Sequence, residues 1–330
     1  MTPQELASRL FFIVGCGRSG TTLLKSMLAA HPGVYLPPET FFFSSVRPRF
    51  PGAAQAAVDE RLRYICSRWW MRDAGLDRAE LERQLELADQ SAERDSPDWH
   101  AMFLASLSAL TPAGEWLAIG EKTPAHVLVA EELLDAFPEC RVIQVVRDPR
   151  AVLSSYRKVK VGTNEAVAVA REWMAATEVH RRLREHPRAT QVHYESMVTE
   201  PESVLRGLCE HLRIPFDPEM MRFHERSDAG YAAEQTHHAA TRRPVFQDRM
   251  QAWRKELPPQ QLAMLEARLG NRLADFGYEP SQGLPKVGSF ALRMSHWRDQ
   301  MHRVTVRRGR QYMKRRRALN RIAQNQGAGD

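Results

Sequence analysis

A glycine-rich segment that carries one cation is the part of the chain best suited to chemistry. Residues 15–20 follow a short apolar run, contain three glycines and place Arg18 beside Ser19, just before a predicted helix. Backbone N–H groups in such a loop, together with the positive end of the helix dipole, favour a phosphate or a sulfate. The sequence therefore predicts an anion site formed by Gly17, Arg18, Ser19, Gly20, Thr21 and Thr22.

The residue that follows the last glycine argues against ATP chemistry. The nucleotide triphosphate loop has the pattern G-x-x-x-x-G-K-[ST], whereas Thr21 stands at the lysine position here. Without that lysine, the loop is poorly equipped to hold a γ-phosphate with magnesium. A P-loop kinase that uses ATP and magnesium is the first alternative, and only Asp148 could supply its strand-end acid.

The elements around the loop alternate between apolar strands and amphipathic helices. Strands are expected at 10–14, 116–120, 141–146 and 190–195, and helices at 21–30, 127–137, 164–186 and 201–212. Such alternation predicts a parallel sheet that is covered on both faces. We therefore expect an α/β, P-loop-like, three-layer fold with a central parallel sheet. The segment 41–115 is predicted to be a helical insertion with helices at 53–70, 78–90 and 98–110, in which Trp69 and Trp70 belong to the core.

The positive charge of the chain is concentrated at its C-terminal end. Residues 281–330 hold twelve Lys or Arg and two Asp, which gives +10, so the other 280 residues carry −3 of the total charge of +7. We expect a domain over 1–280 and a basic, amphipathic helical tail over 281–330. Three interpretations of the tail stay open: a helix packed on the domain or on a second copy of the chain in a homodimer, a peripheral helix on an anionic membrane, and a contact with nucleic acid.

Other features of the sequence limit the class of protein. No run of 18 apolar residues predicts a membrane span, and the first residues do not resemble a secretory signal. The four cysteines are scattered, which is typical of a reducing compartment. No metal-binding pattern such as H-E-x-x-H is found. The expected location is the cytoplasm, with peripheral membrane contact as one role for the tail.

Several segments together resemble the sulfotransferases that use 3′-phosphoadenosine 5′-phosphosulfate (PAPS). The Arg18-Ser-Gly-Thr-Thr loop resembles their 5′-phosphosulfate loop. Arg147 at a strand end and Ser155 eight residues later resemble their 3′-phosphate motif. Lys122 in Glu-Lys-Thr-Pro resembles their central lysine, and Tyr194, before a glutamate, resembles a tyrosine-acid pair that ends a strand near the adenine. The resemblance covers about residues 9–280.

Within this family, the sequence is most similar to the tyrosylprotein sulfotransferases and the bacterial enzymes grouped with them. Their arginine loop is followed, 21 residues on, by a catalytic glutamate before a threonine, and here these positions are Glu39 and Thr40. The resemblance implies that Glu39 is the general base. His126 is the alternative base, although its position at a helix start favours a solvent-facing side chain, and Glu121 is interpreted as structural.

The resemblance implies the transfer of a sulfuryl group from PAPS to a hydroxyl acceptor by in-line displacement, which leaves adenosine 3′,5′-bisphosphate and needs no metal. The implied catalytic residues are Glu39, Lys122 and Arg18. Beside the loop residues, the implied cofactor-binding residues are Arg147, Ser155, Tyr194 and Arg243. The acceptor is left open among a carbohydrate, a lipid, a small molecule and a protein tyrosine. The alternative from another class is a non-catalytic protein that binds a membrane or nucleic acid through its basic tail.

Overall fold

The computed structural model describes residues 1–50, 58–88, 98–158, 165–225, 249–298 and 300–301. The chain divides into two compact units, of which the first comprises residues 1–162 and 172–256 and the second residues 163–171 and 257–330. Arg243 and residues 302–330 of the predicted tail lie outside the described residues. Within the described part, no helix combines the length and the apolar character needed to cross a membrane.

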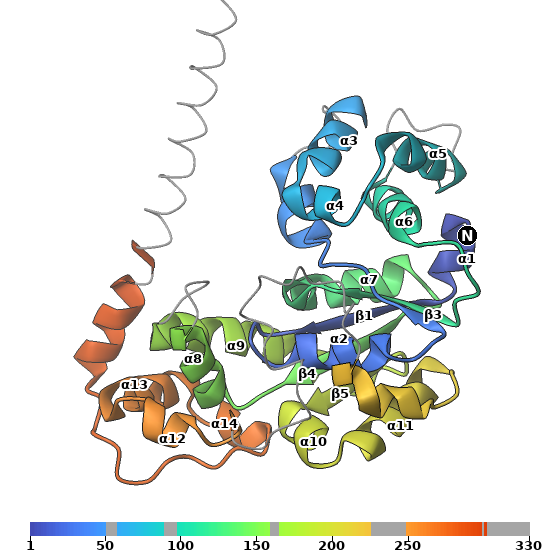
Figure 1. Cartoon of the computed structure of the whole chain (residues 1–330). Coiled ribbons are helices and arrows are strands. Elements are labelled where there is room, and N and C mark those ends of the chain that lie inside the picture. Colours follow the sequence, from blue (N-terminus) through green and yellow to red (C-terminus); the bar gives the residue numbers. More distant parts are fainter. Residues whose placement is uncertain (51–57, 89–97, 159–164, 226–248, 299, 302–330) are drawn as a thin grey trace, which may run out of the picture. The chain divides into compact units, whose positions relative to one another are not determined.

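The first unit is built on a parallel sheet of five strands (Figure 1). The strand order is β2-β3-β1-β4-β5, and the strands are β1 (Leu10–Gly15), β2 (Val34–Tyr35), β3 (Ala118–Lys122), β4 (Arg141–Val146) and β5 (Ala189–His193). In the register, Ile13 of β1 lies beside both Lys122 and Ile143. The carboxyl ends of β1, β3 and β4 therefore meet at one edge, where ligands bind in open α/β sheets.

Helices cover both faces of this sheet, as the alternating sequence pattern predicts. The described helices of four or more residues in the first unit, with α9 reaching into it, are α1 (Pro3–Ala7), α2 (Thr21–Ala29), η1 (Phe42–Val46), α3 (Val58–Ser67), α4 (Trp69–Asp73), α5 (Arg78–Ala88), α6 (Trp99–Leu110), η4 (Pro124–Val129), α7 (Ala130–Ala136), α8 (Pro149–Lys158), α9 (Ala166–Arg182), α10 (Tyr194–Thr199), α11 (Pro201–Leu212), η5 (Pro218–Glu225) and α12 (Trp253–Glu256). The second unit contains α13 (Pro259–Leu269), α14 (Arg272–Asp275) and a helix over residues 289–298.

Alternate residues of the central strand β1 support the two layers of helices. Phe11 and Ile13 pack in one buried cluster with apolar residues of α2, α10, α11 and η5. Phe12 points to the other face, where its ring stacks on Phe103 of α6 and on Phe137. Because both faces are buried, β1 is apolar along its length rather than alternating, as is typical of a central parallel strand.

The structure corrects several predicted boundaries. The strand expected at 116–120 is β3, which continues through Glu121 and Lys122 because these residues pair with Phe12 and Ile13 and are buried. The helix expected at 53–70 is interrupted at Arg68, whose backbone is extended, and yields α3 and α4 in its described part. The helix expected at 127–137 begins as the 3-10 helix η4 before α7.

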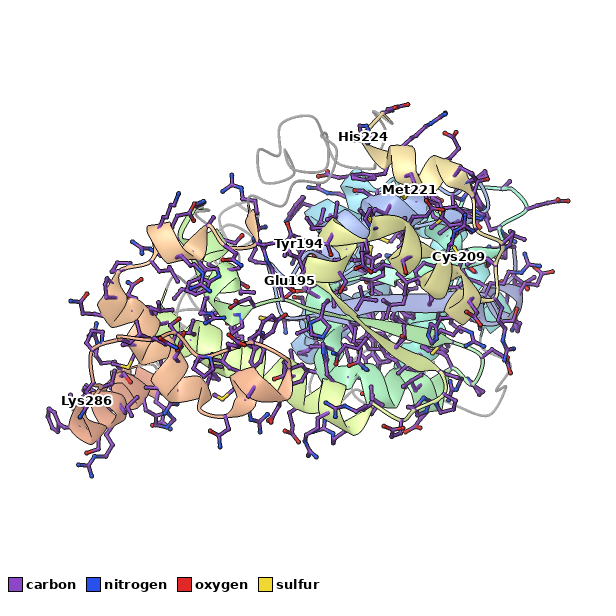
Figure 2. The ribbon with its side chains drawn as sticks, turned by 90° about the horizontal axis from the view of Figure 1, so that it is seen from below. Tyr194, Glu195, Cys209, Met221, His224 and Lys286 are labelled. Carbon is purple, nitrogen blue, oxygen red and sulfur yellow. The ribbon has the colours of Figure 1, made fainter. Side chains whose placement is uncertain are left out.

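The fourth predicted strand ends earlier in the structure than the sequence suggested. Tyr194 and Glu195 were expected to end that strand, but β5 ends at His193, and Tyr194 is the first residue of α10 (Figure 2). The insertion is helical, as predicted. Its Trp69 is not a core residue, because 51% of the residue is exposed.

Candidate active site

The glycine loop turns between β1 and α2 through backbone angles that ordinary residues avoid. Gly20 has φ of 99° and precedes α2 without any side-chain hydrogen bond to cap the helix. A Cβ at Gly20 would overlap a ring carbon of Tyr194. Arg18 is also left-handed, with φ of 68°, which is uncommon for a residue with a side chain. Strain of this kind gathers at ligand sites, and the uncapped first turn of α2 is suited to an anion.

Two buried polar atoms near this loop have no hydrogen-bond partner among the described residues. They are the hydroxyl oxygen of Ser19, which is fully buried, and the Nε of Arg147, a residue only 8% exposed. A buried donor left unsatisfied costs about 1–3 kcal/mol. Both groups can donate to an anion, so the loop and Arg147 together fit a ligand that carries phosphate or sulfate oxygens.

Arg147, just after β4, comes together with Arg18, Ser155 and Tyr194. The Nε of Arg18 donates to the hydroxyl of Ser155 at 3.2 Å, and the Nη1 of Arg147 donates to the carbonyl of Arg18 at 3.2 Å. The Arg147 guanidinium also lies over the Tyr194 ring, 3.9 Å from its centroid. Burial lowers the pKa of Arg18, and neighbouring Arg147 adds to that shift. Because the charge of Arg147 acts on the Arg18 guanidinium, an anion bound by both side chains would relieve their repulsion.

Asp148, the acid that follows Arg147, is hydrogen-bonded to a neighbouring arginine. Asp148 accepts hydrogen bonds from Arg150, whose Nε and Nη2 lie 2.8–3.1 Å from its two carboxylate oxygens. Its own N–H donates to the Glu195 carboxylate at 3.1 Å. The carboxylate of Asp148 is thus engaged with Arg150, which is unfavourable for the magnesium site that a kinase would need there.

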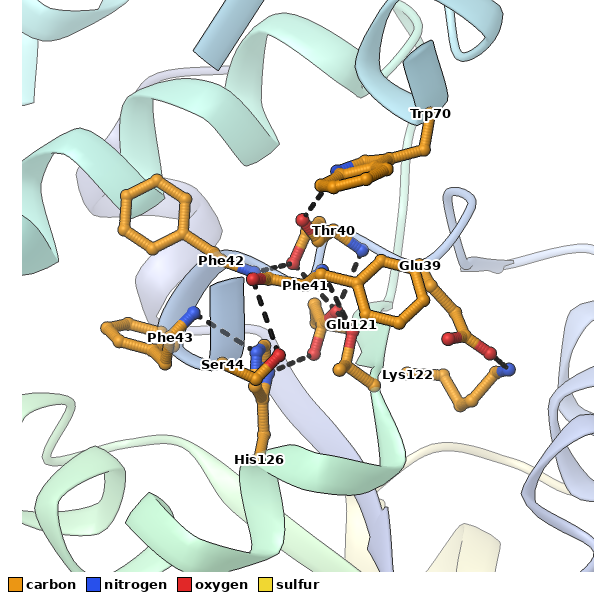
Figure 3. Close-up of polar contacts among 11 residues, drawn as sticks. Glu39, Thr40, Phe41, Phe42, Phe43, Ser44, Trp70, Glu121, Lys122 and His126 are labelled. Atoms are coloured by element: carbon orange, nitrogen blue, oxygen red, sulfur yellow. Dashed lines mark hydrogen bonds and ion pairs between the residues drawn. The ribbon is translucent and has the colours of Figure 1, made fainter. Parts of the chain in front are cut away.

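Glu39 and Lys122 form an ion pair at the carboxyl edge of the sheet (Figure 3). Lys122 is the last residue of β3, and its side chain is fully buried, whereas the side chain of Glu39 is 22% exposed. The Nζ of Lys122 also donates to the hydroxyl of Thr22, in the first turn of α2, at 3.3 Å. Lys122 therefore connects the glycine loop to the one predicted base that has partial access to solvent.

A buried network around Glu121 fixes the backbone that follows Glu39 (Figure 3). One carboxylate oxygen of Glu121 accepts from the N–H and hydroxyl of Thr40 at 3.2 and 2.8 Å, and from the hydroxyl of Thr123 at 2.6 Å. The indole N–H of Trp70 donates to the Thr40 carbonyl at 2.9 Å. Because these bonds surround Thr40, they restrict the position of the adjacent Glu39.

His126 belongs to this network and is not solvent-facing as the sequence suggested. It is fully buried, its Nδ1 donates to Glu121 at 2.8 Å, and its Nε2 accepts from the N–H of Phe43 at 3.2 Å. Burial raises the pKa of Glu121, but contact with His126 and hydrogen bonds from Thr123 and Thr40 outweigh it, so the pKa lies below its ordinary value. Glu121 is structural in this arrangement, as expected, and both nitrogens of His126 are engaged.

Lys25 of α2 contacts the backbone that precedes Glu39. It is fully buried, and its Nζ donates to the carbonyl of Pro37 at 2.6 Å, two residues before Glu39. Burial, reinforced by nearby Lys122, lowers the pKa of Lys25 to about 7, although Glu39 and Glu121 act in the opposite direction. Lys25 and the Glu121 network therefore hold the segment before and after Glu39.

The low pKa of Lys25 predicts a specific dependence of stability on pH. An unfolded lysine titrates near 10.5, so between about pH 7 and pH 10.5 the unfolded chain binds more protons than the folded one, and the free energy of unfolding rises with pH through this site. Lys25→Met should remove that contribution, and urea unfolding across this range should show it as a shallower rise. Lys255→Met, at an exposed lysine, is the control. An unchanged pH dependence in Lys25→Met would contradict the assignment.

Sequence reasoning missed Lys25, the hydrogen bonds from Thr40 and Thr123 to Glu121, and the hydrogen bond from Trp70 to the Thr40 carbonyl. A signal for Lys25 was present, since it lies one turn after Thr21 and next to Leu24, on the side of the helix that also carries Leu28. The predicted residues Gly17–Thr22, Glu39, Lys122, Arg147, Ser155 and Tyr194 all lie at the carboxyl edge or in the elements that follow it. Arg243 lies outside the described residues.

The fold and these motifs define a class of enzymes, and comparison with known proteins identifies it. The model of the sulfotransferase family matches residues 11–218, which is more than half of the chain. The chain therefore belongs to the sulfotransferase family.

Among its relatives is protein-tyrosine sulfotransferase A of Caenorhabditis elegans, 24% identical over 292 residues that cover 85% of this chain and 70% of the relative. Protein-tyrosine sulfotransferase 1 of Danio rerio is 27% identical over 291 residues, which cover 84% of this chain and 75% of the relative.

Solved structures confirm the predicted fold class. The sulfotransferase domain of the Synechococcus PCC 7002 olefin synthase superposes with a TM-score of 0.58 at 22% identity, covering 82% of this chain and 94% of that domain. The sulfotransferase domain from the curacin biosynthetic pathway superposes with a TM-score of 0.56 at 19% identity, covering 82% of this chain and 98% of that domain. At these identities, the likeness concerns the fold.

Proposed function

We propose that this sulfotransferase uses PAPS as its sulfuryl donor. When bound, PAPS supplies an activated sulfuryl group on a phosphate leaving group. The observation that carries the proposal is the meeting of Arg18 with Arg147 and Ser155, which belong to a segment distant in the sequence, beside a buried Ser19 hydroxyl without a partner among the described residues. In this proposal the loop holds the 5′-phosphosulfate, while Arg147 and Ser155 hold the 3′-phosphate. Tyr194 lies toward the adenine, and Arg243 is proposed as a further contact.

In the proposed reaction, Glu39 is the general base. The acceptor oxygen forms a bond to sulfur as the bond between sulfur and the bridging phosphate oxygen breaks, and the hydroxyl proton passes to the Glu39 carboxylate. Lys122 and Arg18 stabilise the charge on the sulfuryl and bridging oxygens. The partial exposure of Glu39 supports this role, whereas both nitrogens of His126 are already hydrogen-bonded. No metal is needed if these cations and the loop amides supply the charge; among the described residues no group suited to a metal is found.

The acceptor is proposed to be a hydroxyl compound that lies against Glu39. Two relatives are named protein-tyrosine sulfotransferases, so tyrosine peptides are the first acceptors to test, followed by carbohydrates, lipids and small phenols. Two aromatic side chains near Glu39 support an acceptor with a flat apolar part. Phe41 has φ of 47° and contacts the edge of the half-buried Trp70 ring at 5.2 Å between centroids.

Nucleotide titration followed by a transfer assay tests this function. Adenosine 3′,5′-bisphosphate should bind more tightly than adenosine 5′-phosphate or ATP with magnesium, and label from [35S]PAPS should pass to a hydroxyl acceptor. Preference for ATP with magnesium, together with phosphate transfer, would indicate a kinase. Binding of neither nucleotide would favour a non-catalytic protein.

A further inference from the structure

The helix over residues 289–298 carries an exposed apolar stripe. Phe290, Met294 and Trp297 follow one another at spacings of four and three residues, which places them on one side of the helix. They are 70%, 39% and 54% exposed. Single exposed apolar residues are ordinary on protein surfaces, but three aligned on one helix face mark an interaction surface.

The opposite side of this helix is the one that contacts the rest of the second unit. Leu292 and Ser295 are half-buried, and His296 lies 3.2 Å from the Nη2 of Arg268 in α13. At about 100° per residue, these positions lie on the far side from the apolar stripe. The stripe is therefore directed away from the α13 contact.

Positive charges flank the stripe on both sides. Arg293 and Arg298 are exposed and lie about 60–80° to either side of the line through Phe290 and Trp297. Lys286, which precedes the helix, is also exposed (Figure 2). In the sequence, residues 281–330 carry +10, whereas the other 280 residues carry −3.

This combination of charge and apolar surface selects the partner. A second copy of the chain would bring two segments of +10 together, which opposes self-association through this face. Nucleic acid would use the charge but leave the apolar stripe in water. At an anionic bilayer, apolar side chains enter the acyl boundary while flanking arginines reach the phosphate groups.

We propose that the helix over residues 289–298, with Lys286, Arg293 and Arg298 beside its apolar stripe, is a peripheral binding surface for anionic membranes. It would bring the sulfotransferase to acceptors at a lipid surface. The residues of this surface are different from those assigned to the nucleotide site, all of which precede residue 281.

Vesicle binding by the full chain tests this proposal. Co-sedimentation should be strong with vesicles that mix phosphatidylserine into phosphatidylcholine, weak with phosphatidylcholine alone, and reduced by salt, because screening acts over about 8 Å at physiological ionic strength. Phe290→Ser with Trp297→Ser should weaken binding about tenfold or more. Leu117→Ser with Leu128→Ser, at two exposed leucines outside the tail, is the matched control, because it removes exposed apolar side chains without changing the charge.

A depth readout tests whether the stripe itself enters the membrane. Lipids with brominated acyl chains should quench the tryptophan fluorescence of the protein, and Trp297→Phe should lose most of the quenching while still binding vesicles. Circular dichroism and nucleotide affinity should be unchanged in these variants. Three results would each overturn the proposal. The first is equal binding to neutral and anionic vesicles, and the second is binding to an RNA oligonucleotide but not to vesicles. The third is the absence of vesicle binding together with a dimer that dissociates in the Phe290→Ser, Trp297→Ser variant.

Discussion

Glu39→Gln is expected to bind adenosine 3′,5′-bisphosphate normally and to turn over about 10²–10⁴-fold more slowly, the usual scale for loss of a general base. The amide keeps the shape of the side chain but cannot accept the proton. Single-turnover transfer from [35S]PAPS separates this loss from product release. Glu115→Gln, at an exposed glutamate, is the control.

The ion pair with Lys122 complicates this substitution, so a second variant is needed. Glu39→Gln leaves the buried Lys122 ammonium without this carboxylate partner, which destabilises the site independently of catalysis. Glu39→Asp keeps the charge and withdraws it by one methylene, so it should retain more activity than Glu39→Gln while melting closer to the wild type. Normal turnover by Glu39→Gln would exclude Glu39 as the base and return attention to His126.

The sequence was sufficient to predict four of the five strands and the loop, because their signals are local, whereas the two-residue strand β2 was missed. Continuous apolar strands such as 10–14 and 141–146 identify buried parallel strands, and the glycines at 15–20 identify a turn into a helix. Since parallel strands share one carboxyl edge, residues that follow β1, β3 and β4 had to come together. Arg18, Lys122 and Arg147 do so for this topological reason.

The details that position Glu39 could not be predicted, because they depend on which charged residues the fold buries. Lys25 and Glu121 are charged residues that a sequence pattern places at a surface or a strand end. In the structure, both are fully buried and hold the segment that contains Glu39. The start of α10 at Tyr194 was missed for a different reason: aromatic residues are enriched in strands, so Tyr194 favoured a continued strand.

Arg147→Ala is expected to weaken the binding of adenosine 3′,5′-bisphosphate by about 2–4 kcal/mol, the range for loss of a charged, desolvated contact. At 1.4 kcal/mol per tenfold, this corresponds to roughly 30–1000-fold in Kd. Adenosine 5′-phosphate, which lacks the 3′-phosphate, should lose far less. Titration calorimetry with the two nucleotides measures the difference.

The comparison of two ligands keeps this test valid if the substitution also disturbs the site. Arg147 contacts the Arg18 carbonyl and the Tyr194 ring, so Arg147→Ala also removes packing that both nucleotides use. Arg147→Lys should keep part of the charge but lose the planar, bidentate grip, and should bind the bisphosphate with intermediate affinity. Arg72→Ala, at an exposed arginine, should change neither affinity. Equal losses for the two nucleotides in Arg147→Ala would show that Arg147 acts on the shared part of the ligand, and the 3′-phosphate assignment would then be wrong.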